Sequence, residues 1–282
     1  MRFRRGARLD PSQVSDRRRS GGAPMAIGAG GGAIGLIFLL VQLLAGGGGG
    51  SGLALGGEEP ATDLSAECRT GEDAAQDEDC RILAVVNSVQ ESWSGRLDGY
   101  QDADTVFFSG GTSTGCGNAT SAVGPFYCPT DATVYIDLDF YDDLRSRFGA
   151  SGGPFAEAYV IAHEYGHHIE NLMGVLERSR DGSTGPQSSA VRVELMADCL
   201  AGMWAEDAER TDVIEDLTEQ DIRDGLDAAA AVGDDRIQES VQGRVDPESW
   251  THGSAEQRQR WFRTGYEQGS LDACDTFAVS QV

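Results

Sequence analysis

The chain has 282 residues, of which 40% are hydrophobic and 24% are charged, a balance typical of a folded globular protein rather than a disordered one. Its formal net charge is −24, and all 22 basic residues are arginine. Seven of these arginines precede residue 25, so the rest of the chain is more acidic still. Because such a chain repels a phosphate backbone, nucleic-acid binding is excluded as its function.

The N-terminal part predicts a membrane anchor. Residues 25–45 (MAIGAGGGAIGLIFLLVQLLA) carry no charge and match the roughly 20 residues that a helix needs to span a bilayer. Arginines at 17–19 precede this stretch, so the positive-inside tendency predicts a cytoplasmic tail over residues 1–24 and an extracytoplasmic remainder. A cleaved signal peptide is the alternative. We expect a single-pass cell membrane protein with its folded domain outside.

A Gly-rich and acidic stretch, residues 46–66, predicts a flexible linker, and the folded domain is expected over residues 67–282. The six cysteines all follow the predicted anchor: Cys68, Cys80, Cys116, Cys128, Cys199 and Cys274. An even count on the non-cytoplasmic side favours disulfides over thiolate metal sites. Two local loops of equal separation, 68–80 and 116–128, would leave 199–274 as a long-range bridge, and free buried thiols are the alternative.

Residues 154–174 (PFAEAYVIAHEYGHHIENLMG) predict one helix that contains an HExxH motif. His163 and His167 are four residues apart, so both imidazoles project from one helix face and can reach a single metal ion. Glu164 is rotated off that axis, where it can accept a proton from a metal-bound water without being a ligand. The apolar flanks argue against a solvated helix face, because buried polar groups need partners.

Residues 187–210 predict a second helix, which carries two acids one turn apart on an otherwise apolar surface. A catalytic zinc ion takes three protein ligands and leaves a fourth position to water. Glu194 is the candidate third ligand. Asp198 is expected to accept a hydrogen bond from the far nitrogen of a ligating histidine. If the helix register differs, Asp198 becomes the ligand instead.

The HExxH motif followed by ExxxD resembles the gluzincin arrangement of zinc metallopeptidases, and the chain is similar to the putative neutral zinc metallopeptidase family of bacteria, the YpfJ-like proteins. The similarity covers residues 75–278, and its motifs occur in order at 124–129 (GPFYCP), 134–138 (VYIDL), 158–168 (AYVIAHEYGHH), 194–199 (ELMADC) and 252–258 (HGSAEQR). The resemblance implies a zincin-like fold, zinc ligands His163 and His167, catalytic base Glu164 and, by the gluzincin analogy, third ligand Glu194.

Three further features carry weaker predictions. His252 is a candidate donor to the oxyanion of the tetrahedral intermediate, with a local cap as the alternative and Tyr127 or Tyr135 as substitutes. His168 shares the face of Glu164 and could bond it, line the cleft or bond a backbone carbonyl. Residues 133–138 predict a strand, and because zincins lay peptides along a strand edge, this strand is the expected peptide platform.

Together these features predict an α+β domain with a small sheet from residues in about 82–140, followed by helices over 154–173, 187–209, 218–231 and 254–268. One Zn²⁺ is expected on His163, His167 and Glu194, with peptides or proteins as substrates. The predicted function is hydrolysis of peptide bonds by a zinc-activated water. The alternatives are a catalytically inactive zinc-binding envelope module that binds peptides or partner proteins, and an interaction protein with a structural metal site.

Overall fold

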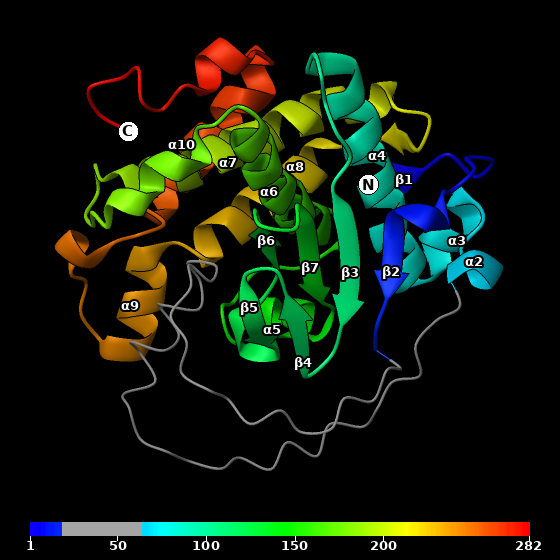
Figure 1. Cartoon of the computed structure of the whole chain (residues 1–282), viewed down its shortest axis with the longest axis horizontal. Coiled ribbons are helices and arrows are strands. Elements are labelled where there is room, and N and C mark those ends of the chain that lie inside the picture. Colours follow the sequence, from blue (N-terminus) through cyan, green and yellow to red (C-terminus); the bar gives the residue numbers. More distant parts are fainter. Residues whose placement is uncertain (19–63) are drawn as a thin grey trace.

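The computed structural model describes residues 1–18 and 64–282 of the chain. They form a mixed α+β fold in which a four-stranded sheet lies beside a group of packed helices (Figure 1). The long helices are α4 (Glu78–Arg96), α6 (Pro154–Leu172), α7 (Ser189–Asp207), α8 (Glu219–Ala231) and α10 (Ala255–Gln268). The shorter helices are α2 (Leu64–Glu67), α3 (Gly71–Gln76), α5 (Asp139–Ser146) and α9 (Asp234–Gln242).

The main sheet has four strands in the order β2 (Val14–Asp16), β3 (Asp104–Phe108), β7 (Thr133–Asp137) and β6 (Phe126–Cys128). Strands β2, β3 and β7 run parallel, and β6 is antiparallel to β7. The platform prediction for residues 133–138 is therefore wrong, because β7 is an inner strand whose two edges are both paired. The edge strand next to it is β6. A separate hairpin is formed by β4 (Gly111–Thr114) and β5 (Gly117–Thr120).

The N-terminal residues belong to the same folded unit as residues 64–282. Strand β1 (Arg2–Phe3) pairs with β8 (Ile214–Asp216), and β2 pairs with β3. The side chains of Phe3, Leu9 and Val14 are buried in the main core. Figure 1 shows this segment lying against α3 and α4.

These contacts correct the predicted membrane topology. A cytoplasmic tail could not pair with strands of a domain on the other side of a bilayer. In residues 1–18 and 64–282, no helix is both long and apolar enough to cross a membrane. The predicted anchor, residues 25–45, and most of the predicted linker fall outside the described residues. A single-pass membrane protein is therefore not supported.

The helices of the second half begin and end where the sequence supplies caps. Pro154 occupies the first turn of α6, and the Ser188 hydroxyl accepts a hydrogen bond from the backbone of Val191 at the start of α7. Helix α10 begins with a capping box, in which Ser254 and Gln257 bond each other's backbone amides. The four predicted helices differ from α6, α7, α8 and α10 by two residues or fewer at each end.

The predicted sheet region differs more from the structure. Its first part, from residue 82, is helical, because residues 78–96 form α4 with Asp77 as its N-cap. Helix α4 is buried along most of its length, so its apolar run resembles that of an inner strand. Helix α9 was not predicted.

Three disulfides connect the six cysteines as expected. They join Cys68 to Cys80, Cys116 to Cys128 and Cys199 to Cys274, and none of the six is free. The third bridge ties the middle of α7 to the C-terminal turn at Leu271–Cys274. It therefore fixes a helix that carries candidate site residues to the end of the chain.

Candidate metal centre

Helix α6 presents His163 and His167 on one face, as their spacing requires. Their ring centroids are 4.8 Å apart, and the side chain of His163 is buried while that of His167 keeps a small exposed fraction of 12%. Gly166 lies between them and faces α7, where a Cβ atom would lie 2.9 Å from the Ala197 backbone. The absence of a side chain at Gly166 thus allows the two helices to approach closely.

Helix α7 brings Glu194 to the two imidazoles. Its Oε2 atom is 3.3 Å from Nε2 of His163, and its Oε1 atom is 3.6 Å from Nε2 of His167. The ligand atoms of the three residues all lie within 4.8 Å of one another. Tetrahedral ligands about 2.0–2.1 Å from a zinc ion are separated by about 3.4 Å, so the donor set and its spacing fit zinc. Among the described residues, no fourth His, Cys, Asp or Glu joins this group.

The other ring nitrogens of the two histidines contact carboxylates. Nδ1 of His163 is 2.9 Å from Oδ1 of Asp198, and Nδ1 of His167 is 2.7 Å from Oε2 of Glu170. Each Nδ1–H can therefore donate to a carboxylate, which leaves each Nε2 lone pair directed at Glu194. The sequence led us to expect such a bond at Asp198, whereas it gave no expectation for Glu170.

The charges in this cluster affect proton and cation binding alike. Burial lowers the pKa of His163, but Asp198 and Glu194 outweigh it and raise that pKa to about 9. For His167, burial dominates and lowers the pKa to about 4. Burial raises the pKa of Glu194, yet the charges of His252, His167 and His163 hold it well below its ordinary value. Positive charge is therefore favoured on His163 but not on His167, and a cation must compete with a proton at His163.

Glu164 is buried beside the ligands but is not part of the group of ligand atoms. Burial raises its pKa to about 7, and the charge of His163 and the backbone amide of Tyr127 oppose the rise. Tyr127 belongs to β6, so this carboxyl lies between the metal-binding helix and the edge strand of the sheet. Its proton affinity suits a group that accepts and releases a proton near neutral pH.

His252 lies in the loop before α10 and is also buried. Its backbone amide and those of Thr251 and Gly253 all donate to Oδ2 of Asp234, which fixes the loop. Nδ1 of His252 is 3.4 Å from Oδ1 of Asp234, and Nε2 has no hydrogen-bond partner among the described residues. Burial lowers the pKa of His252, but the nearby charges of Glu194 and Asp234 raise it overall. When the His252 ring is protonated, it thus carries an Nε2–H close to Glu194 that has no partner among the described residues.

The other candidate donors are already engaged. The Tyr127 hydroxyl accepts from the Asn171 amide and bonds Nδ1 of His168, whose Nε2 bonds the backbone oxygen of Gln101. The Tyr135 hydroxyl donates to Asp131. His168 therefore joins α6 to β6 and to the segment before β3, and among the described residues neither of its hydrogen bonds goes to Glu164.

Sequence reasoning missed three residues around the site. Glu170 follows His167 by three positions on the same helix, and that spacing is a signal that could have revealed it. Asp234 and Arg258 reach the site only through the fold, because they lie on α9 and α10, and no local pattern indicates their roles.

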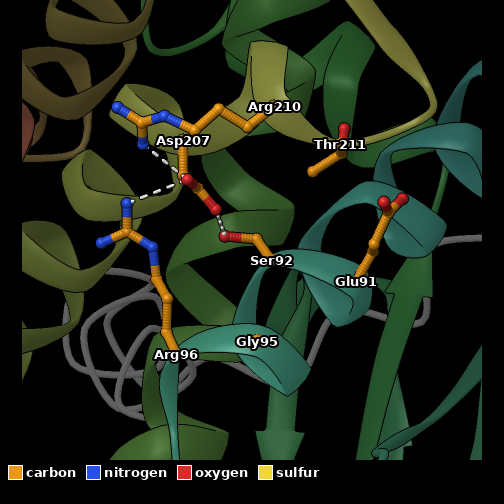
Figure 2. A pocket seen from close by; sticks show the side chains of 7 residues that line it. All are labelled: Glu91, Ser92, Gly95, Arg96, Asp207, Arg210 and Thr211. Atoms are coloured by element: carbon orange, nitrogen blue, oxygen red, sulfur yellow. Dashed lines mark hydrogen bonds and ion pairs between the residues drawn. The ribbon is translucent and has the colours of Figure 1, made fainter.

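A surface pocket of about 250 Å³ lies elsewhere, between the C-terminal ends of α4 and α7. Residues 194 and 207 of α7 are about 20 Å apart at 1.5 Å per residue, so the pocket is remote from the metal ligands. Figure 2 shows Arg96 and Arg210 both directed at Asp207, which also accepts from Ser92. These arginines are paired with acids, so the cluster joins the two helices and offers no free anion site.

The chain is similar to a known protein family and to several curated proteins. A family model described as putative neutral zinc metallopeptidase matches residues 1–277. An uncharacterized protein of Mycobacterium tuberculosis (strain ATCC 25618 / H37Rv) is 54% identical over 230 residues, which cover 79% of this chain and 78% of that protein. Protein YpfJ of Escherichia coli (strain K12), also described as uncharacterized, is 40% identical over 289 residues, covering 97% and 98%. No solved structure matches the chain.

Proposed function

The chain belongs to the putative neutral zinc metallopeptidase family, and from this membership we propose that it is a zinc-dependent peptidase with a zincin-like fold. His163, His167 and Glu194 would hold the ion. The observation that carries the proposal is that three spaced ligand atoms converge from two helices, with a non-ligand carboxyl beside them. Zinc in such a site supplies Lewis acidity, which polarises a peptide carbonyl and lowers the pKa of water towards about 7.

The protein's own side chains would carry out the proton transfers and stabilise the oxyanion. Glu164 accepts the proton of the attacking water and delivers it to the leaving amine, as its raised pKa allows. His252 donates its Nε2–H to the oxyanion that develops on the peptide carbonyl, supported by the absence of any other partner for that atom among the described residues. An extended peptide would add to the outer edge of β6, beside Glu164, where no described strand pairs with it.

The number of candidate metal ligands, three among the described residues, favours a catalytic zinc site over a structural one. A structural zinc site closes all four positions with protein ligands, whereas a catalytic site leaves one open. The described residues supply three. Stoichiometric zinc without any chelator-sensitive cleavage would instead favour the zinc-binding module.

Replacing Glu164 with Gln tests the mechanism. The variant removes the proton acceptor but keeps the shape and all three ligands, so zinc content should match the wild type. Hydrolysis should fall by at least about 100-fold, the lower bound for losing a general base. The measurement is metal analysis plus cleavage of a peptide library by the full chain, with and without a chelator. Wild-type cleavage by Glu164→Gln would refute the role of Glu164.

A further inference from the structure

Asp198 accepts hydrogen bonds from four donor atoms, which belong to three residues. Its Oδ2 atom accepts from Nε of Arg258 at 2.8 Å, and its Oδ1 atom accepts from Nη2 of Arg258 at 3.0 Å and from the Tyr159 hydroxyl at 2.5 Å. Nδ1 of His163 is the fourth donor. Asp198 and Arg258 are both buried, with exposed fractions of 0% and 2%.

Arg258 also fixes the direction of the Tyr159 hydroxyl. Its Nη2 atom donates to the Tyr159 oxygen at 3.1 Å, so the hydroxyl proton is left to point at Asp198. The remaining Nη1 atom bonds the backbone oxygen of Val232. Because guanidinium has donors in a fixed planar fork and no acceptor, its position determines where the Asp198 oxygens lie.

This arrangement determines which nitrogen of His163 can bind a cation. Nη2 of Arg258 is 3.4 Å from Nδ1 of His163, and both atoms act as donors to Oδ1 of Asp198. A carboxylate held as an acceptor keeps the proton of His163 on Nδ1 and its lone pair on Nε2, which faces Glu194.

We propose that Arg258 is a positioning residue for the metal ligand His163: it holds the Asp198 carboxylate against Nδ1 and thereby presents Nε2 to the cation. This inference rests on the proposed zinc site. Arg258 is too deeply buried to bind substrate, and four of its five N–H donors bond Asp198, Tyr159 and the backbone oxygen of Val232.

The second histidine provides an internal contrast. Glu170 contacts Nδ1 of His167, but its Oε1 atom is buried without a partner, and no arginine contacts it among the described residues. Of the two histidines, only His163 therefore has a carboxylate partner that is itself bonded by an arginine among the described residues. The fold supplies this cation from α10, which packs closely on α7 where Gly265 meets the backbone of Cys199.

The test uses full-length Arg258→Met, Arg258→Lys and the double variant Asp198→Asn/Arg258→Met, with the exposed Arg263→Met on the same helix as the control. Zinc affinity is measured by competition with a chromophoric chelator, ligand geometry by the visible spectrum of the cobalt-loaded protein, and folding by far-UV circular dichroism. The double variant is included because a lone buried carboxylate can prevent folding, whereas a neutral pair avoids that penalty.

We expect Arg258→Met and the double variant to bind zinc roughly 10–100-fold more weakly, with an altered cobalt spectrum, while Arg263→Met matches the wild type. Arg258→Lys should recover part of the affinity, since it restores charge without the fork. The proposal is overturned if Arg258→Met or the double variant is folded and has wild-type zinc affinity and a wild-type cobalt spectrum. It is also overturned if all three Arg258 variants fail to fold. Wild-type protein that binds zinc but cleaves no peptide would contradict the proposed function while leaving this comparison valid.

Discussion

Glu164 and Glu194 are both buried near the same two histidines, yet their surroundings give them opposite proton affinities. Burial raises the pKa of Glu164 to about 7. Burial acts on Glu194 in the same direction, but the charges of His252, His167 and His163 prevail and keep its pKa low. The carboxylate that stays ionised suits a ligand, and the one that holds a proton near neutrality suits an acid–base role.

His252 allows a prediction for a single side chain. Substituting His252 with Ala removes the unpartnered Nε2–H, so kcat should fall by roughly 100-fold while KM and zinc content change little, because the bond forms mainly in the transition state. Steady-state kinetics with a cleaved peptide, together with metal analysis, measure this effect.

A matched control is His168→Ala, which removes another buried histidine from outside the metal ligands. Its two hydrogen bonds go to Tyr127 and the Gln101 backbone, so it should lower the melting temperature with a much smaller effect on kcat. Equal losses of kcat in both variants would contradict a specific role for His252.

For individual site residues, the sequence predicts those whose partners are close in the chain or follow a spacing rule. His163, Glu164 and His167 are positioned by one helix, and Glu194 and Asp198 by another. Glu170 obeys the same rule and could have been found. Asp234 and Arg258 could not, because a buried arginine on α10 is recognised only when α10 is known to lie against α7.

At the scale of elements, helices with clear caps are predicted well, and short strands are not. Proline at 154 and the Ser254–Gln257 pair indicate where α6 and α10 begin. Strands β1, β2 and β6 have only two or three residues, too few for a recognisable alternation. The order of strands in the sheet depends on pairing between distant segments, which is why the edge was assigned to β7 rather than β6.

Helices α6 and α7 carry all three candidate ligands, so their spacing should control metal binding. Replacing Gly166 with Ala would place a Cβ atom 2.9 Å from the backbone of Ala197 and push the helices apart. We expect a loss of roughly 1–3 kcal/mol in the free energy of unfolding and weaker zinc binding. Denaturant unfolding and chelator competition measure the two effects.

The control is Gly95→Ala near the end of α4, where a Cβ atom meets nothing within 4 Å. Alanine in an unobstructed helix should stabilise the protein by roughly 0.5–1 kcal/mol. If Gly166→Ala were as stable as Gly95→Ala and bound zinc as tightly as the wild type, the close approach of α6 and α7 would not be required.

At the scale of the whole molecule, the N-terminal residues complete the domain rather than stand apart from it. Arg18 lies between two acids, with Nη2 at 2.6 Å from Asp16 and 2.5 Å from Asp79, and its guanidinium lies over the ring of Phe107. The sequence presented Arg18 as part of a positively charged tail because one of its two acidic partners, Asp79 on α4, is distant in the chain. Charge counted along a segment does not reveal such pairing.

Val14 gives the sharpest test of this arrangement. It is buried at the start of β2, where it pairs with Thr105 of β3, while the next residue, Ser15, is exposed on the same strand. Val14→Asp would bury an unpaired carboxylate and should lower the free energy of unfolding by roughly 2–4 kcal/mol, whereas Ser15→Asp should change it by less than about 0.5 kcal/mol. Urea unfolding of the full chain followed by circular dichroism compares the two. Because a tail outside the fold would tolerate a charge equally at either position, indistinguishable unfolding curves would mean that residues 1–18 do not pack on the domain.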